Sequence, residues 1–284
     1  MRKIFVISCA LVVQGLLISQ ANAAVVPSGT ILDKKQEVVR HLKDEPASLD
    51  PINAVGLTEA QVQRDLFEGL VIEDERGRPI PGVAQSWRTE DNRVWIFTLR
   101  DNAKWSNGEK VTASDFVYSW QRLVDPKNLS PFAWYAQKII DGKLKPTALG
   151  VEAIDEKTLK VTLERPVPYF PSLATNFSLY PVPKHTIEKY GSEWIKVGNL
   201  VGNGAFILKD RVVNEKIVLR PNPYYWDHHN TVLTKVTFVP INHESQASKR
   251  YLAGDIDITE SFPKHLYHKL MKDIPEQVYI PEQL

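Results

Sequence analysis

The stretch that decides the fold is Val94-Trp-Ile-Phe-Thr-Leu-Arg-Asp-Asn-Ala-Lys-Trp-Ser-Asn-Gly-Glu-Lys-Val-Thr-Ala-Ser-Asp-Phe116. Its first part alternates, because Trp95, Phe97 and Leu99 fall on one side of an extended chain. This pattern predicts a strand with one large apolar face. Asn107-Gly108 follows as a turn signal, since both residue types tolerate a positive φ.

A helix is predicted directly after this turn. Thr112-Ala-Ser-Asp115 has the spacing of a capping box, with Asp in the usual Glu or Gln place. The buried face of the helix is expected from its apolar residues, which are Phe116, Trp120, Leu123 and Val124. Asp125-Pro126 ends the helix. The stretch therefore predicts a strand, a turn and a helix in succession.

Outward from this stretch, strands alternate with helices along the chain. Extended segments are expected at 38–41, 159–163, 217–219, 236–239 and 256–259. One helix is expected to begin with Thr58 as its N-cap, and another to cover 245–252. A mainly antiparallel patch occupies roughly 94–163. The order predicts an α/β fold with an inserted α+β region.

Composition limits the function classes. The chain has 284 residues, with 35 Lys and Arg against 34 Asp and Glu and a formal net charge of +1. Hydrophobic residues make up 43% and charged residues 24%, which excludes a disordered, collagen-like or coiled-coil chain. We expect no nucleic-acid partner, because nothing indicates a broad basic surface.

The first 23 residues have the three parts of a secretory signal peptide. Arg2 and Lys3 precede an apolar run from Ile4 to Ile18, and Ala21-Asn-Ala23 is an A-x-A cleavage signal. We expect export through the Sec pathway, cleavage after Ala23 and a bacterial periplasmic location. Cleavage would also remove the single cysteine, Cys9, so stability must come from core burial without disulfides.

The sequence offers few candidates for catalysis. It contains no G-x-S-x-G elbow, no P-loop and no dinucleotide fingerprint. Asp255 with Asp257, and His265 with His268, are the pairs that a hydrolase could use. The simpler interpretation is a solvated turn for the first pair and a solvated helix surface for the second. His228-His229 is the remaining metal-like spacing, without a third ligand. We expect no metal, no cofactor and no catalysis.

Several motifs together resemble a known family. They are Arg64-Asp-Leu-Phe-Glu-Gly-Leu70, Gly82-Val-Ala84, Phe97-Thr-Leu-Arg100, Ala103-Lys-Trp105, Val111-Thr-Ala-Ser-Asp-Phe116, Tyr118-Ser-Trp-Gln-Arg122, Pro166-Val-Pro-Tyr-Phe170, Gly202-Asn-Gly-Ala205 and Gly254-Asp-Ile-Asp257. They resemble the signature of the periplasmic oligopeptide- and dipeptide-binding proteins, which are family 5 of the solute-binding proteins of ATP-driven importers. Within the family, residues 43–50, 130–134 and 249–262 are similar to the murein-peptide receptors.

The resemblance implies a two-lobed clamp that closes on an extended peptide, whose backbone pairs as in strand addition. It places a discontinuous first lobe in residues 24–67 and 181–284, with 68–180 as an inserted α+β subdomain. The implied peptide contacts are Ala54, Val55, Gly56, Leu57, Phe132, Thr259, Glu260 and Ser261. The implied partners are a short oligopeptide or murein tripeptide and an inner-membrane ABC permease, with the receptor acting as a monomer.

The length leads to a further expectation. Relatives in this family are far longer, and the chain stops at Pro281-Glu-Gln-Leu284, near where the family crosses into its second lobe. We therefore expect a truncated receptor that lacks the second lobe and binds peptide weakly. Three alternatives stay open: half of a split receptor, a periplasmic peptide hydrolase and a surface adhesin. The segment between Tyr135 and Lys138 is also shorter than in relatives, beside the expected contact at Phe132.

Overall fold

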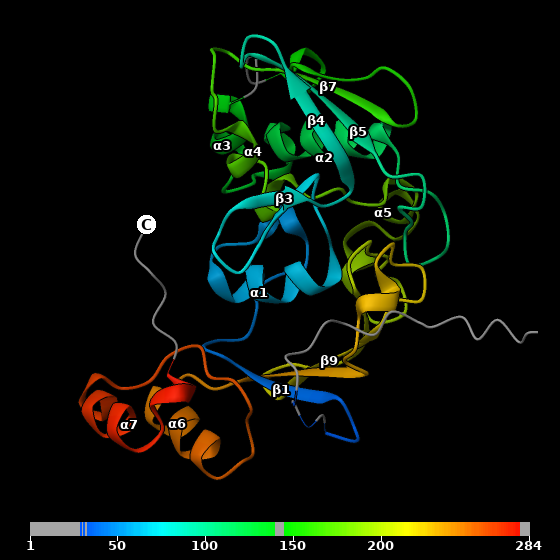
Figure 1. Ribbon diagram of the computed structural model, residues 1–284. Helices are drawn as coiled ribbons and strands as arrows, with labels where there is room; N and C mark the ends of the chain where they lie inside the picture. The colour runs from blue at the N-terminus through cyan, green and yellow to red at the C-terminus, as the bar shows by residue number, and fades with distance from the viewer. Residues whose placement is uncertain (1–28, 30, 32, 140–144, 279–284) are drawn as a thin grey trace, which may run out of the picture.

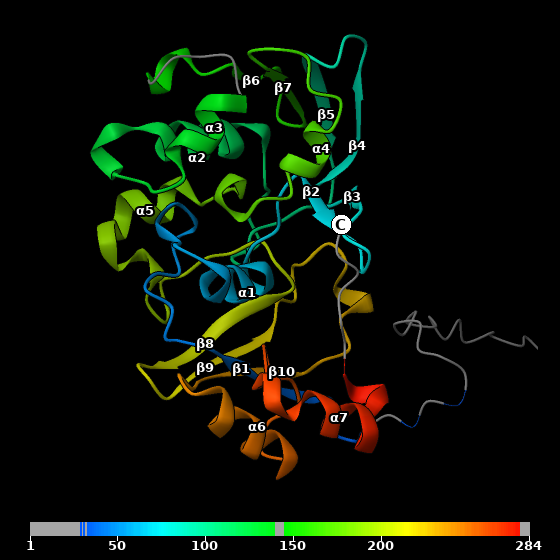
Figure 2. The ribbon, with the colours of Figure 1, turned by 90° about the vertical axis from the view of Figure 1, so that its left-hand side faces the viewer.

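The computed structural model describes residues 29, 31, 33–139 and 145–278. The predicted signal peptide, residues 1–23, lies outside the described residues. Two four-stranded sheets dominate the structure, and helix α1 (Leu57–Leu66) lies between them in both views (Figures 1 and 2). The chain has an α/β fold. None of the helices in the described part of the chain has the length and apolar character that a membrane span requires.

The first sheet combines one strand from the start of the described chain with three strands from residues 206–240. Its strands are β1 (Glu37–Leu42), β8 (Phe206–Val212), β9 (Lys216–Pro221) and β10 (Lys235–Pro240), in the spatial order β1-β10-β9-β8. β1 pairs in parallel with β10, and the other pairs are antiparallel. α1 covers one face, while α6 (Glu244–Leu252) and α7 (Tyr267–Asp273) lie on the other side near β1 (Figures 1 and 2).

The second sheet comes from the middle of the chain and is antiparallel throughout. Its strands are β4 (Ala84–Thr89), β5 (Val94–Leu99), β6 (Val151–Ala153) and β7 (Thr158–Thr162), in the order β4-β5-β7-β6. The predicted strand is confirmed as β5, which buries Trp95, Phe97 and Leu99. The predicted helix is confirmed as α2 (Ala113–Val124), where the Thr112 N–H donates to Asp115 Oδ2 at 2.8 Å.

Shorter elements connect and cover the two sheets. The remaining strands and α-helices are β2 (Val71–Glu73), β3 (Pro79–Pro81), α3 (Ala133–Ile139), α4 (Phe170–Leu173) and α5 (Lys184–Tyr190). The 3-10 helices are η1 (Pro51–Asn53), η2 (Pro126–Asn128), η3 (Pro146–Ala148), η4 (Phe177–Leu179), η5 (Gly191–Ile195), η6 (His228–Asn230), η7 (Lys264–Leu266) and η8 (Pro275–Gln277).

Two local expectations were wrong. α1 has Gly56 as its N-cap instead of Thr58, because the Glu59 carboxylate reaches back to accept the Gly56 N–H at 3.1 Å. The strand expected at 256–259 is reduced to one parallel bridge between Arg40 and Ile258, since the segment leaves β1 after two residues. The strand β8 was not predicted, because three consecutive charged residues, Lys209, Asp210 and Arg211, interrupt its apolar alternation.

The two sheets are joined where two backbone segments, Leu66–Glu68 and Gly202–Gly204, lie in close contact. We call this contact the crossing. Asn203 donates through Nδ2 to the Glu68 C=O at 2.8 Å and accepts the Glu68 N–H through Oδ1 at 3.0 Å. The Gly204 N–H donates to the Leu66 C=O at 3.0 Å. A Cβ atom on Gly202 would lie 2.0 Å from the Leu66 carbonyl oxygen. Glycine is therefore required for the two backbones to approach this closely.

The Glu68 side chain occupies the same crossing and is 4% exposed. Its carboxylate accepts the Trp226 indole N–H at 2.7 Å and the Tyr225 hydroxyl, while Arg100 lies 3.6 Å above the Trp226 ring. Burial raises the pKa of Glu68 to about 7, although both hydrogen bonds and Arg100 favour the charged form. A proton therefore binds Glu68 more tightly in the folded chain than in the unfolded chain.

We predict that Gly202→Ala lowers the free energy of unfolding by about 3 kcal/mol, because the new methyl group overlaps the Leu66 backbone. Gly198→Ala is the matched control. Gly198 has a φ of +88°, and a Cβ added to it would meet no atom within 4 Å, so alanine there should cost only about 1 kcal/mol of backbone conformation. Urea unfolding measures both, and an equal loss for the two variants would contradict the steric argument.

We also predict that Glu68 makes stability fall as pH rises. The folded pKa of about 7 exceeds the ordinary value of 4.5, so in that window the native state holds a proton that the unfolded state has lost. Wild-type stability should decline by up to about 3 kcal/mol across this window relative to Glu68→Gln, which cannot titrate. Unfolding free energies of both proteins at several pH values measure this. A constant difference between them would refute the prediction.

Candidate functional site

The segment Asp257–Ser261 begins with a short backbone contact along the outer edge of β1. The N–H groups of Asp257 and Ile258 donate to the Val39 C=O at 2.9 and 3.2 Å, and the His41 N–H donates to the Ile258 C=O at 2.8 Å. The Asp257 carboxylate closes the contact by accepting the Val39 N–H at 2.7 Å. These bonds fix the start of the segment and aim the residues that follow it, Thr259 to Ser261, past the end of β1.

The other edge of this segment is open. The backbone N–H and C=O of Thr259 have no hydrogen-bond partner among the residues that the structure describes. An open strand edge of this kind can pair with an extended peptide. The next two side chains bond to their own chain: the exposed Glu260 accepts the Lys43 N–H through Oε2 at 3.1 Å, and Ser261 donates to Glu244 Oε1 at 2.8 Å.

A cavity of about 420 Å³ lies directly beside Thr259, Glu260 and Ser261. Its walls come from α6, α7, η8 and the segment itself. The apolar lining residues are Leu252, Ile258, Phe262, Leu270, Ile274 and Val278. Asp257 and Glu260 add carboxylates to this lining. The open edge thus borders an apolar hollow with an acidic wall.

The loop Ala54–Leu57 runs from η1 to the start of α1. Ala54 is fully buried, which anchors the loop, whereas Val55 and Leu57 are 66% and 75% exposed. Gly56 lies between them in an extended conformation and caps α1. Two large apolar side chains are therefore held outward by a loop whose two ends are fixed.

Phe132 is tethered to the same 3-10 helix. Ser130 Oγ donates to the Ile52 C=O at 2.5 Å and accepts the Phe132 N–H at 3.2 Å. The Phe132 ring is half-buried against Phe177, with the ring centres 5.1 Å apart and the planes at 79°. The structure therefore attaches Phe132 and the Ala54–Leu57 loop to one support. Within the described chain, no hydrogen bond or ring contact joins either of them to Thr259–Ser261.

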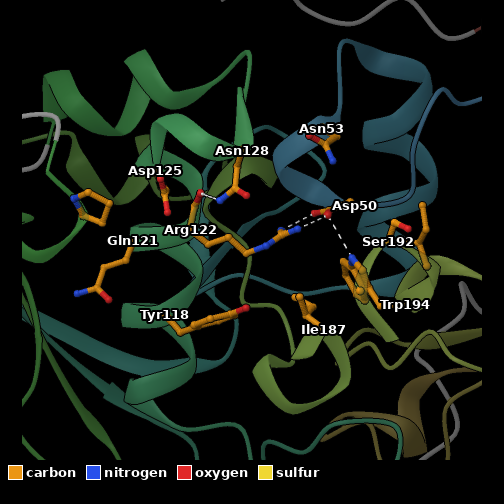
Figure 3. Close-up of a pocket in the computed structure, with 13 residues that line it drawn as sticks. Asp50, Asn53, Tyr118, Gln121, Arg122, Asp125, Asn128, Ile187, Ser192 and Trp194 are labelled. Atoms are coloured by element: carbon orange, nitrogen blue, oxygen red, sulfur yellow. Dashed lines mark hydrogen bonds and ion pairs between the residues drawn. The ribbon is translucent and has the colours of Figure 1, made fainter. Parts of the chain in front are cut away.

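That support is held by a buried ion pair at Asp50 (Figure 3). Arg122 donates to both carboxylate oxygens of Asp50, at 2.9 and 2.6 Å, and the Trp194 indole N–H donates to Oδ2 at 3.2 Å. Asp50 is 3% exposed. The Asp50 side chain also accepts the Ile52 N–H at 3.3 Å, which starts η1. One carboxylate thus joins η1, α2 and η5.

A polar groove of about 600 Å³ opens beside this ion pair, between α2 and η5 (Figure 3). Tyr118, Gln121 and Asn128 line it, and Arg122 points across it toward Asp50 (Figure 3). None of the residues predicted to contact peptide lines this groove. Asp50, Arg122 and Trp194 were missed as site residues. Arg122 lies 72 residues and Trp194 lies 144 residues from Asp50 in the sequence, so no local sequence pattern pairs them.

The residues considered for a hydrolase have separate partners. Asp257 bonds to the β1 backbone at Val39, and Asp255 lies 3.8 Å from Arg250. His265 and His268 are exposed on η7 and α7. Gly254 has a φ of +81°, which confirms the turn before Asp255. Among residues 33–139 and 145–278, no group of three or more His, Cys, Asp and Glu side chains is arranged to hold a metal ion.

Comparison with known proteins places the chain. Residues 78–282 match the bacterial extracellular solute-binding proteins, family 5, middle region. The chain belongs to this family. It is 63% identical to the periplasmic murein peptide-binding protein MppA of Escherichia coli over 99% of its own length and 53% of that protein. It is 50% identical to the oligopeptide-binding protein OppA of the same organism, covering 93% of this chain and 50% of OppA.

Solved structures of family 5 proteins have the same fold as this chain. The solved structure of MppA in its unliganded open form superposes with a TM-score of 0.87 at 64% identity, over 91% of this chain and 52% of MppA. The relatives compared are named as periplasmic binding proteins. The family 5 chain spans about half the length of the curated relatives that it matches.

We predict that Arg122→Leu lowers the free energy of unfolding by about 3 to 5 kcal/mol, because it leaves the Asp50 carboxylate buried without its cation. The matched control is Lys110→Leu, which breaks the exposed 3.7 Å pair with Glu156 and should change stability by less than about 1 kcal/mol. Chemical unfolding followed by tryptophan fluorescence reports both. A small effect of Arg122→Leu would show that the ion pair does not hold η1.

Proposed function

We propose that this chain forms one lobe of a periplasmic receptor that binds short peptides and delivers them to an inner-membrane ABC permease. The observation that carries the proposal is 63% identity to a murein peptide-binding protein over nearly the whole chain. The favoured ligands are therefore murein tripeptides or other short oligopeptides. The proposal includes export to the periplasm with cleavage after Ala23, and action as a monomer.

The proposed peptide contacts come from three places. The open backbone edge at Thr259 pairs with the peptide main chain, as in strand addition. The exposed side chains of Val55 and Leu57 supply apolar contact. The Phe132 ring, which is held in place by Phe177, supplies a further apolar contact through its exposed part. Ala54, Gly56, Glu260 and Ser261 complete the proposed set, with Ala54 acting from its buried position as the anchor of the loop.

We further propose that the first lobe consists of residues 24–67 and 181–284, with 68–180 inserted as a subdomain. The order of strands supports this division. β1 comes from the first range and β8, β9 and β10 from the second, yet the four form one sheet. The strands of the other sheet, β4 to β7, all lie between residues 84 and 162.

One lobe alone presents only one side of a clamp. A peptide bound to it would lose its translational and rotational freedom as in the full clamp, but would gain only part of the contacts. We therefore propose that residues 24–284 on their own bind peptide on the order of a thousandfold more weakly than a two-lobed receptor. A separate chain that supplies the other lobe would restore the affinity, and native co-purification tests for such a partner. We propose no catalytic step.

We predict weak, edge-dependent peptide binding by residues 24–284. Calorimetry with a murein tripeptide should give a Kd well above about 1 μM. Thr259→Pro removes the backbone N–H at the open edge and should weaken binding at least about tenfold further, whereas Thr259→Ala keeps the backbone and serves as the control. Binding at 1 μM or tighter would overturn the proposed weak binding by residues 24–284 alone. Equal binding by both variants would overturn pairing at Thr259.

A further inference from the structure

A buried histidine lies behind the proposed peptide-contact segment. His41, near the end of β1, is 1% exposed. Its neighbour on the same face of the strand, Val39, packs in the small apolar cluster beneath α6 that contains Ala247. His41 Nε2 lies 2.8 Å from the Ile241 carbonyl oxygen, and Nδ1 lies 3.4 Å from the Glu260 backbone nitrogen. The ring therefore bridges the end of β10 and the Thr259–Ser261 segment.

The two partners fix the tautomer of the ring. The Ile241 carbonyl can only accept, so Nε2 must carry a proton. The Glu260 N–H can only donate, so Nδ1 must carry none. Both contacts are satisfied together only by neutral imidazole protonated at Nε2. Segments 200 and 219 residues away from His41 are thus held by one protonation state.

We propose that neutral His41 is the positioning residue for the Glu260–Ser261 end of the peptide-contact segment, and that a proton on Nδ1 releases this end. A protonated Nδ1 presents N–H to the Glu260 N–H, so two donors face each other and the backbone amide loses its acceptor. The start of the segment keeps its place, because its bonds to Val39 and to the His41 backbone do not involve the imidazole.

One charged neighbour, Glu260, favours this rearrangement. The titratable and charged side chains on the elements around the contact are Asp257 and Glu260 on the segment, Glu37, Arg40 and Lys43 on and just after β1, Lys235 on β10, and His243, Glu244, Lys249 and Arg250 at the start of and along α6. Among the carboxylates, Glu260 is the one whose own backbone N–H contacts the imidazole. The Glu260 carboxylate, which accepts the Lys43 N–H in the neutral state, is available to accept the new Nδ1–H as a charge-assisted hydrogen bond. Turning toward His41 would break its bond to Lys43 and move the segment.

Amide hydrogen exchange tests the proposal without any ligand. The protection of the Glu260 amide is compared with that of the Ile258 amide, in wild type and in His41→Gln, between about pH 8 and pH 5, where histidines change charge. Glutamine carries a donor and an acceptor but does not titrate. The ratio of wild type to variant at each pH cancels the intrinsic pH dependence of exchange. His185→Gln, at an exposed histidine, is the matched control and should behave as wild type.

At about pH 8 the wild type and His41→Gln should protect the Glu260 amide equally, and at about pH 5 the wild type should protect it about tenfold less, with Ile258 unchanged. A ratio that is constant with pH, or an equal change at Ile258, overturns the proposal. Ring nitrogen chemical shifts of the wild type give a second measurement that needs no variant. They should report the Nε2–H tautomer at high pH, and an Nδ1–H tautomer would overturn the proposal.

The consequence for peptide binding rests on the proposed function. Murein tripeptide affinity should fall more steeply from about pH 8 to pH 5 in wild type than in His41→Gln. A parallel decline in both proteins would contradict a link between His41 and the ligand. If no peptide binds at any pH, the proposed function fails, while the exchange experiment still decides whether His41 positions the segment.

Discussion

The contact between Leu66–Glu68 and Gly202–Gly204 is the constraint on which the two-sheet arrangement depends. Backbone lies against backbone there, with no room for a Cβ at Gly202. The Asn203 side-chain amide accepts the Glu68 backbone N–H and donates to the Glu68 C=O across the crossing. Because the first sheet carries Thr259–Ser261 on its edge and the second sheet packs with α2, this crossing sets the distance between the structures that hold the proposed peptide contacts.

Buried polar side chains then fix the local geometry of η1, of the crossing and of the Glu260 segment. Asp50, Glu68 and His41 are each at most 4% exposed, and each contacts residues more than fifty positions away. A buried polar group without partners is strongly destabilising, so each of these side chains permits only arrangements that satisfy it. Apolar packing tolerates small shifts, whereas these groups specify one geometry. In this chain they lie directly behind η1, the crossing and the Glu260 segment.

Interactions between residues close together in the sequence were predictable, whereas those between distant residues were not. β5 and α2 were predictable, because alternation and the Thr112–Asp115 cap act within a few residues. The Gly56 cap was missed, since Thr58 offered an equally good local signal and only the Glu59 contact decides between them. The family motifs contained Glu68 and Arg122, but their buried partners lie far along the chain. Periodicity carries no information on such pairs.

The proposed peptide contacts cover only one side of an extended peptide. Val55 and Leu57 are held outward, although burying side chains of this kind is worth roughly 1.5 to 3 kcal/mol each. The Thr259 edge likewise leaves backbone groups unpaired beside an apolar hollow within the described chain. An extended peptide that paired with this edge would keep its second edge in water. Tight binding therefore requires a second surface that pairs with the outer edge of the peptide and covers these side chains.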